Sequence, residues 1–208
     1  MNTPASLPRF KSRVVPVVVI SDIAQAVPLA EALLDGGIDV IEVTLRSDTA
    51  LRAIEAIARA VPGIQVGAGT VTRAAEVAQV IAAGARFGLS PGATPALLEA
   101  VTRHGLPFIP GVATASEAMA ARDAGFDLLK CFPARELGGV ELLRAWAGPL
   151  PGIRFCPTGG VSASDVGRYL ALPNVAMVGG SWLTPAAALQ VGDFAEITRL
   201  ARAARAAG

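Results

Sequence analysis

The chain has 208 residues, of which 52% are apolar and only 17% are charged, so it can bury a sizeable core and is not intrinsically disordered. Its 18 basic and 17 acidic residues nearly cancel and form no dense basic cluster, so we expect no nucleic-acid partner. The low charged fraction leaves surface apolar enough to contact another subunit, which predicts a homo-oligomer. We expect one domain over residues 1–208.

Nothing in the sequence indicates a membrane or an export signal. The strongest apolar run, Val14–Ile20, contains Pro16 and is far shorter than the roughly 20 residues that span a bilayer. The first residues also lack a basic segment followed by an apolar stretch and a cleavage site. We therefore expect a cytoplasmic protein without a membrane partner. Cys131 and Cys156 lie in no metal-binding or disulfide pattern, and we interpret both as small buried side chains.

Short runs rich in Val, Ile, Leu and Phe alternate with Ala-rich stretches whose apolar residues recur every three or four positions, which indicates strand followed by helix. The predicted strands are Val14–Ile20, Val40–Thr44, Gln65–Gly69, Arg86–Ser90, Pro107–Pro110, Asp127–Phe132, Ile153–Pro157 and Val175–Gly179. Helix start signals, including a capping box at Thr114–Glu117, and glycines at helix ends delimit the helices between them.

Eight such units predict an α/β fold, a (β/α)8 TIM barrel, with a short N-terminal helix within Ala5–Arg13 closing its bottom. The main alternative is a doubly wound open sheet. It is disfavoured because the first predicted strand ends in Ile20 without the glycine-rich turn that binds dinucleotides.

Barrel active sites are built at the C-terminal ends of the strands, where Lys130 is the most unusual candidate. It is one of only two lysines in the chain, the other being Lys11, and it lies in an apolar strand. One interpretation is that its amine simply extends from a strand end into solvent. The other is that burial and a nearby cation such as Arg46 disfavour the ammonium form, leaving a neutral amine that forms a Schiff base with a carbonyl carbon.

Glu42 is the second candidate at a strand end. It alternates with Ile41 and Val43, so its carboxylate lies on the opposite face of the strand, which is the expected barrel interior. A buried carboxylate can transfer the protons that imine chemistry requires. An internal ion pair with Arg46 is the alternative, and the two interpretations are compatible.

Glycine pairs follow the last two predicted strands, at the loops where barrels commonly bind phosphate. Gly159 and Gly160 precede a helix start at Ser162, and a second Gly-Gly pair precedes Ser181. Their backbone N–H groups and the serine hydroxyl can hold an anion, although tight turns also use such pairs. His104 is interpreted as a helix-end residue without a role. No metal-ligand spacing occurs, so we expect a mechanism without metal or cofactor.

These motifs together resemble the family of 2-keto-3-deoxy-6-phosphogluconate (KDPG) and 4-hydroxy-2-oxoglutarate (KHG) aldolases, which form a Schiff base with pyruvate. The resemblance covers nearly the whole chain and rests on EVTLR, GAGT, SPG, KCFPA, RFCPTGG and GGSW at Glu42–Arg46, Gly67–Thr70, Ser90–Gly92, Lys130–Ala134, Arg154–Gly160 and Gly179–Trp182. One departure is Arg135, which follows FPA where the family often has Glu. It leaves the aldol chemistry intact and bears on substrate preference.

The resemblance implies cleavage of KDPG to pyruvate and glyceraldehyde 3-phosphate, with KHG as a second substrate, by a homotrimer. Lys130 would form the imine and Glu42 would act as general acid and base. The implied substrate-binding residues are Arg46 and Thr70 for the pyruvate carboxylate, Pro91 and Phe132 for the pyruvate pocket, Thr158 for stereochemistry, and Gly159, Gly160 and Ser181 for the phosphate. The alternatives are oxaloacetate decarboxylation through the same imine, or a non-catalytic phosphosugar-binding barrel, which has no need of a lysine in an apolar strand.

Overall fold

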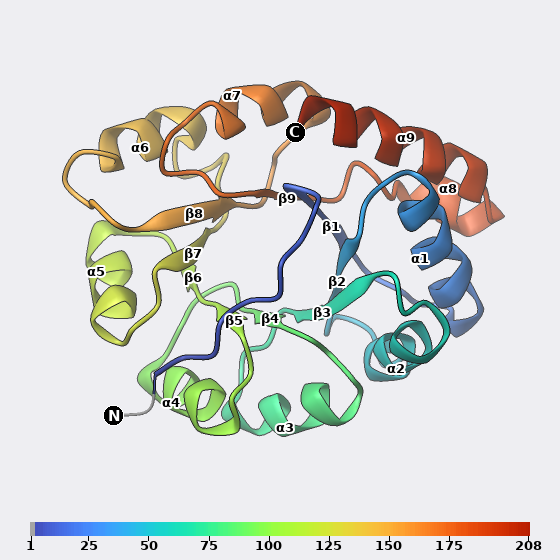
Figure 1. The fold of residues 1–208 in the computed structure, drawn as a ribbon, viewed down its shortest axis with the longest axis horizontal. Coiled ribbons are helices and arrows are strands. Elements are labelled where there is room, and N and C mark those ends of the chain that lie inside the picture. The colour runs from blue at the N-terminus through green and yellow to red at the C-terminus, as the bar shows by residue number, and fades with distance from the viewer. Residues whose placement is uncertain (1–2) are drawn as a thin grey trace.

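A computed structural model describes residues 3–208 of the chain. Within them, strands and helices alternate, and the helices surround the strands (Figure 1). The strands are β1 (Val14–Val18), β2 (Val40–Thr44), β3 (Gln65–Gly69), β4 (Gly88–Leu89), β5 (Phe108–Ile109), β6 (Gly111–Val112), β7 (Leu128–Cys131), β8 (Arg154–Pro157) and β9 (Val178–Gly180). The helices are α1 (Ala26–Asp35), α2 (Ala50–Ala60), α3 (Ala74–Ala82), α4 (Pro95–His104), α5 (Ala115–Asp123), α6 (Gly139–Trp146), α7 (Val166–Leu170), α8 (Ala186–Val191) and α9 (Phe194–Ala207), with 3₁₀ turns η1 (Ile23–Gln25) and η2 (Ala163–Asp165).

The strands form a closed parallel barrel. One sheet has the order β5-β4-β3-β2-β1-β9 and the other has the order β6-β7-β8. Only Pro110 separates β5 from β6, so the two segments form one interrupted barrel strand. Parallel bridges between Phe155 and Val175 and between Thr158 and Gly179 join β8 to the β9 side. The predicted (β/α)8 barrel is therefore confirmed.

Local sequence signals place most elements correctly. The observed β2 and β3 have the predicted bounds, whereas β4 and β5 keep only the middle of their predicted ranges. The capping box at the start of α5 is present, because Thr114 Oγ1 accepts from the Glu117 N–H and the Glu117 carboxylate accepts from the Thr114 N–H. His104 is the last residue of α4, before Gly105 in the left-handed conformation (φ 67°), as expected for a helix end.

The predicted N-terminal helix is wrong. Residues 5–13 contain no helix, and this segment instead runs beneath the barrel as an extended chain (Figure 1). Pro8 interrupts any helical hydrogen bonding there, and the Asp39 carboxylate accepts from the backbone N–H groups of Lys11 (2.8 Å) and Ser12 (3.0 Å). Phe10 packs against Phe87 inside the barrel, with ring centroids 5.1 Å apart. The segment thus closes the bottom of the barrel without forming a helix.

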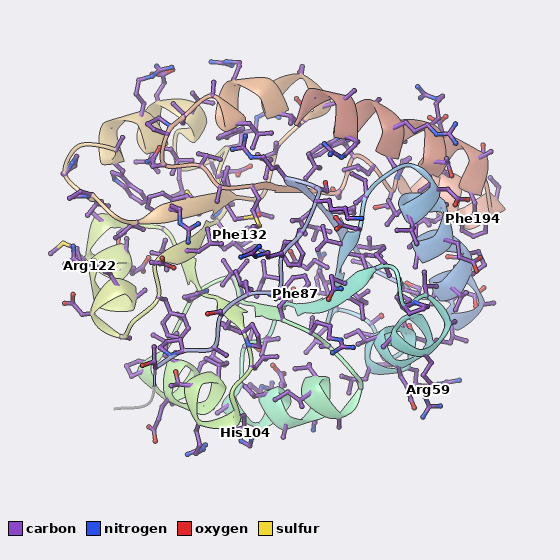
Figure 2. All side chains as sticks on the ribbon, in the orientation of Figure 1. Arg59, Phe87, His104, Arg122, Phe132 and Phe194 are labelled. Atoms are coloured by element: carbon purple, nitrogen blue, oxygen red, sulfur yellow. The ribbon has the colours of Figure 1, made fainter. Side chains whose placement is uncertain are left out.

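The barrel interior is filled with side chains. All five residues of β2 are buried, on both faces of the strand, as expected where helices cover the outside of a parallel sheet. Figure 2 shows Phe87 and Phe132 near the middle of the molecule, whereas Arg59, His104 and Arg122 lie on the outer helices. Glu42 in the middle of β2 and Lys130 in β7 are therefore buried in this interior.

Candidate active site

One cavity of about 780 Å³ opens where the strands end, and all ten residues predicted for the site line it. These residues are Glu42, Arg46, Thr70, Pro91, Lys130, Phe132, Thr158, Gly159, Gly160 and Ser181. They come from the ends of different strands and from the loops that follow them, because parallel strands in a barrel all end at the same rim.

A buried ion pair lies at the floor of this cavity. Lys130 Nζ, on β7, donates to Glu42 Oε1, on β2, at 2.9 Å, and the two side chains are only 5% and 1% exposed. Lys130 therefore does not extend into solvent. The sequence offered an ion pair between Glu42 and Arg46 as an alternative, but Glu42 pairs with Lys130 instead. We also expected the Arg46 cation beside the amine, whereas the charged group next to it is the Glu42 carboxylate. The aromatic ring of Phe132 lies beside the amine, with its centroid 5.4 Å from Nζ.

Only one of the two oxygens of the Glu42 carboxylate accepts a hydrogen bond from the described residues. Oε1 accepts from Lys130, while Oε2 is buried without a hydrogen-bond partner in residues 3–208. The carboxylate fits only because Gly69 on β3 has no side chain: a Cβ there would lie 2.6 Å from Glu42 Cγ and still closer to Oε1. A buried carboxylate oxygen without a partner is costly unless it serves a ligand or a proton transfer.

Arg46 and Thr70 lie on the rim above this pair. The Arg46 side chain has no carboxylate within 4.0 Å among the described residues, so its guanidinium is available to an anionic ligand. Thr70 has φ 58° and is the only non-glycine residue of residues 3–208 in the left-handed region. Such a conformation costs of order 1 kcal/mol and is found disproportionately at functional sites.

The opposite end of the cavity presents backbone donors. Gly160, Val161 and Ser181 line the cavity, and their N–H groups have no hydrogen-bond acceptor among residues 3–208. The expected helix start at Ser162 is only the short 3₁₀ turn η2, in which the Asp165 carboxylate accepts from the Ser162 hydroxyl and N–H. An anion at this end would therefore depend on the unpaired N–H groups and not on a long helix.

Thr158 lines the cavity, and Cys156 is buried beside it. Thr158 Oγ1 faces Gly179, whose missing side chain leaves it room, and lies 3.7 Å from Cys156 Sγ. Burial raises the pKa of both Cys131 and Cys156 to about 12, so neither thiol is a nucleophile near neutral pH. The two cysteines are free and buried, as the sequence indicated.

Sequence reasoning missed the apolar wall of the cavity. The additional lining residues include Val17, Val19, Thr44, Thr184, Pro185, Ala186 and Leu189. The period-two pattern of the first strand could have identified Val17 and Val19 as residues on one face. No local signal shows that the segment around α8 folds over the cavity, because this depends on the tertiary arrangement.

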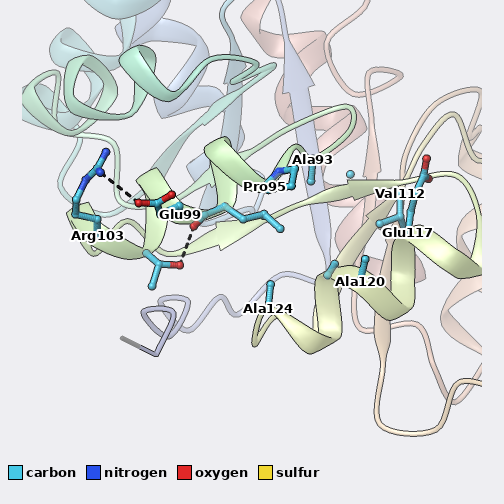
Figure 3. Close-up of a pocket in the computed structure, with 12 residues that line it drawn as sticks. Ala93, Pro95, Glu99, Arg103, Val112, Glu117, Ala120 and Ala124 are labelled. Atoms are coloured by element: carbon cyan, nitrogen blue, oxygen red, sulfur yellow. Dashed lines mark hydrogen bonds and ion pairs between the residues drawn. The ribbon is translucent and has the colours of Figure 1, made fainter. Parts of the chain in front are cut away.

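A second cavity, of about 670 Å³, lies between α4 and α5 (Figure 3). Its wall is built mainly of small apolar side chains such as Ala93 and Ala120, with Glu99 and Arg103 joined in an ion pair at one end. It lacks a lysine and a buried carboxylate, so it does not fit the expected chemistry. In residues 3–208, no three His, Cys, Asp or Glu side chains are grouped as metal ligands, and no helix is long and apolar enough to cross a membrane.

Comparisons with known proteins agree on one family. Residues 9–200 match the family model described as "KDPG and KHG aldolase". A 2-dehydro-3-deoxy-phosphogluconate aldolase of Dickeya dadantii is 53% identical over 92% of this chain and 90% of that protein, and the KHG/KDPG aldolase of Escherichia coli K12 is 52% identical over the same shares.

Solved structures that resemble this chain are also aldolases of this kind. The chain is similar to a KDPG aldolase of Legionella pneumophila in which pyruvate is captured as a covalent carbinolamine, with TM-score 0.91, 46% identity, and coverage of 93% of this chain and 94% of that one. It is also similar to the 2-keto-3-deoxy-6-phosphogluconate aldolase of Zymomonas mobilis ZM4 with 3-phosphoglycerate, with TM-score 0.90, 44% identity, and coverage of 95% and 92%.

Proposed function

Because the chain belongs to the KDPG and KHG aldolase family, we propose that it cleaves 2-keto-3-deoxy-6-phosphogluconate to pyruvate and glyceraldehyde 3-phosphate through a lysine Schiff base. The observation that carries this proposal is the buried pair of Lys130 and Glu42, 2.9 Å apart in the cavity at the strand ends. The amine and the carboxylate are the two groups that an imine mechanism requires.

The ion pair defines the first step. Transfer of a proton from Lys130 Nζ to Glu42 Oε1 leaves a neutral amine and a neutral acid, so the buried site never holds an unpaired charge. The amine adds to C2 of the substrate to give a carbinolamine. Glu42 then returns its proton to the C2 hydroxyl, which leaves as water, so that a protonated imine forms and Glu42 is again a carboxylate. The phenyl ring of Phe132 stabilises the cationic nitrogen.

Bond cleavage follows from the imine. The Glu42 carboxylate removes the proton of the C4 hydroxyl, and the C4 oxygen forms the aldehyde of glyceraldehyde 3-phosphate. The electron pair of the broken C3–C4 bond moves into the C2–C3 enamine and neutralises the imine nitrogen. Protonation of C3 and hydrolysis then release pyruvate and the free lysine. Oε2, which has no partner among the described residues, is the oxygen free to take part in this proton transfer.

Substrate orientation comes from the rim. Arg46 binds the pyruvate carboxylate with its guanidinium and Thr70 contributes to the same end, so that C2 faces Lys130. Pro91 and Phe132 enclose the three-carbon fragment. All four line the cavity that contains the amine.

At the other end, Gly159, Gly160 and Ser181 bind the phosphate through backbone N–H groups and the serine hydroxyl. Thr158, between the two ends, contacts the C4 hydroxyl and so influences stereochemistry at that carbon. A shorter substrate such as KHG uses the carboxylate and imine positions and leaves the phosphate position empty. We therefore propose KHG as a second, poorer substrate.

Two other functions make different predictions. Oxaloacetate decarboxylation uses the same imine but releases carbon dioxide, and a non-catalytic phosphosugar-binding barrel would not require the Lys130–Glu42 pair. The deciding experiment measures pyruvate and glyceraldehyde 3-phosphate from KDPG, pyruvate and glyoxylate from KHG, and pyruvate from oxaloacetate. Equimolar pyruvate and glyceraldehyde 3-phosphate from KDPG at the highest kcat/KM is expected. Release from oxaloacetate alone, or no turnover with any substrate, would overturn the proposal.

The assembly and location of the protein remain predictions. We propose a cytoplasmic homotrimer, a state that the resemblance implies and that the low charged fraction of 17% favours. Sedimentation equilibrium would give three times the 21.1 kDa chain mass, and a monomer at micromolar concentration would contradict the proposal.

A further inference from the structure

The backbone of Arg135 is held beside the loop that carries Gly159 and Gly160. The Ala134 N–H donates to the Thr158 carbonyl at 2.8 Å, and the Arg135 N–H donates to the Gly159 carbonyl at 3.1 Å. These two bonds extend the pairing of β7 with β8 beyond the strand ends. The backbone of Arg135 is therefore held by the same loop that carries Gly160.

The stem of Arg135 lies directly over Gly160. A Cβ atom at Gly160 would come 2.5 Å from Arg135 Cβ and 2.8 Å from its Cδ, so the arginine stem occupies the space that a side chain there would need. Gly160 itself lines the cavity and has φ 68°, a conformation that glycine adopts without strain. The arginine stem thus packs against Gly160, a residue of the cavity wall, while Arg135 as a whole is exposed.

The charge of Arg135 is not neutralised in the structure. Its guanidinium has no carboxylate within 4.0 Å among residues 3–208, and the residue is exposed. The nearby acid at this rim is Asp165, which is occupied by hydrogen bonds from Ser162. Those bonds are the main reason that the pKa of Asp165 is lowered, and the charges of Arg168 and Arg135 contribute less. The cation therefore lies close to η2 and the glycine loop.

The cavity lacks a cation of its own at this end. Among the residues that line it, the cationic ones are Lys130 and Arg46, which serve the imine and the carboxylate in the function proposed above. Backbone N–H groups donate hydrogen bonds to a phosphate but bring no formal positive charge. A guanidinium at the rim supplies the missing charge and a planar pair of donors that matches phosphate oxygens.

We propose that Arg135 is a specificity-determining residue whose guanidinium binds the substrate phosphate, so that the enzyme selects phosphorylated over unphosphorylated 2-keto acids. This inference rests on the proposed aldolase function. Rotation of the terminal side-chain bonds brings the guanidinium over the loop while the stem stays on Gly160. The phosphate is then bound between Arg135 and the N–H groups of Gly160 and Ser181.

The test compares KDPG with its unphosphorylated counterpart, 2-keto-3-deoxygluconate. In Arg135→Gln, which keeps most of the stem and removes the charge, the ratio of the two kcat/KM values is expected to fall about tenfold, mainly through a higher KM for KDPG. Arg135→Lys should retain part of the ratio, because an ammonium still attracts phosphate but without a bidentate contact. Arg122→Gln, at an exposed arginine on α5, is the matched control and should leave the ratio unchanged.

A second readout uses inorganic phosphate as a competitive inhibitor of KDPG cleavage. Its inhibition constant should rise in Arg135→Gln by a factor similar to the loss in the ratio. An unchanged ratio and an unchanged inhibition constant in a folded Arg135→Gln would overturn the role of Arg135 while leaving the aldolase function intact. Failure of the aldolase function is a different result: the unmodified protein would cleave neither substrate.

Discussion

Gly69→Ala is a minimal change that tests whether the Lys130–Glu42 geometry matters. The methyl group would lie 2.6 Å from Glu42 Cγ, 2.7 Å from its Cδ and closer still to Oε1, whereas real Cβ contacts essentially never fall below 3.0 Å. The backbone at Gly69 has no positive φ, so alanine is tolerated there without backbone strain. The expected effect is therefore displacement of the carboxylate and not unfolding of the strand.

The size of the effect follows from these distances. The Glu42 side chain has to move by at least about 0.4 Å at Cγ, and by more at Oε1, which disturbs the geometry of its 2.9 Å bond to Lys130. Catalytic groups must be held to within about 0.5 Å, and a misplacement of about 1 Å can cost 10²-fold in rate. We expect kcat/KM for KDPG to fall about 10- to 100-fold. Overpacking of the interior should lower the free energy of unfolding by about 1–3 kcal/mol.

The assay combines steady-state kinetics with urea unfolding. Gly167→Ala in α7 is the control, because a Cβ there meets nothing within 4 Å and its kinetics should match the parent. In a Glu42→Ala background the clash is gone, so Gly69→Ala should change the residual rate by less than about threefold. Parental activity in a folded Gly69→Ala protein, or an equal loss in both backgrounds, would refute the assigned role of Glu42.

The other predictions concern the base, the phosphate position and the thiols. Glu42→Gln should lower kcat by about 10²-fold while retaining some pyruvate imine, measured by turnover and borohydride trapping; unchanged turnover would make its role structural. Gly160→Asp pushes a Cβ to 2.5 Å from Arg135 Cβ and places a carboxylate beside both Arg135 and the phosphate position, so KDPG cleavage should collapse while imine formation with pyruvate at Lys130 largely survives; an unchanged KDPG to 2-keto-3-deoxygluconate ratio in the folded variant would contradict this. Burial raises the pKa of Cys131 and Cys156 from 9.0 to about 12, so the folded state binds more protons than the unfolded state between those values. Their contribution to stability is therefore complete below pH 9 and lost as the pH rises toward about 12, and a thiol reagent at pH 8 should label them only after denaturation; rapid labelling of the native protein would disprove their burial.

The sequence allows the barrel and its two buried charged side chains to be predicted because both leave local signals. β2 is correct to the residue, since its apolar pattern is uninterrupted apart from one carboxylate. Lys130 and Glu42 are conspicuous because a charged side chain within an apolar strand is costly to bury without a purpose. The N-terminal helix fails because Pro8 interrupts helical hydrogen bonding and the segment is held instead by Asp39 and by the contact of Phe10 with Phe87.

Pairing across the barrel could not be predicted from local patterns. Lys130 and Glu42 are 88 residues apart, and only closure of the sheet determines which charges face one another in the interior. Arg46 lies nearest to Glu42 in the sequence, which made it the expected partner of the ion pair. The placement of Arg135 over Gly160 likewise depends on the backbone bonds between two loops that have no common sequence signature.

Borohydride trapping with pyruvate shows whether Lys130 is the residue that forms the imine. Lys130 lies buried in the cavity, whereas Lys11 is exposed before β1, so each lysine serves as an internal control for the other. Peptide mapping after reduction is expected to show one three-carbon adduct, on Lys130, with loss of KDPG cleavage in proportion to labelling. An adduct on Lys11, or full inactivation without an adduct on Lys130, would contradict the account.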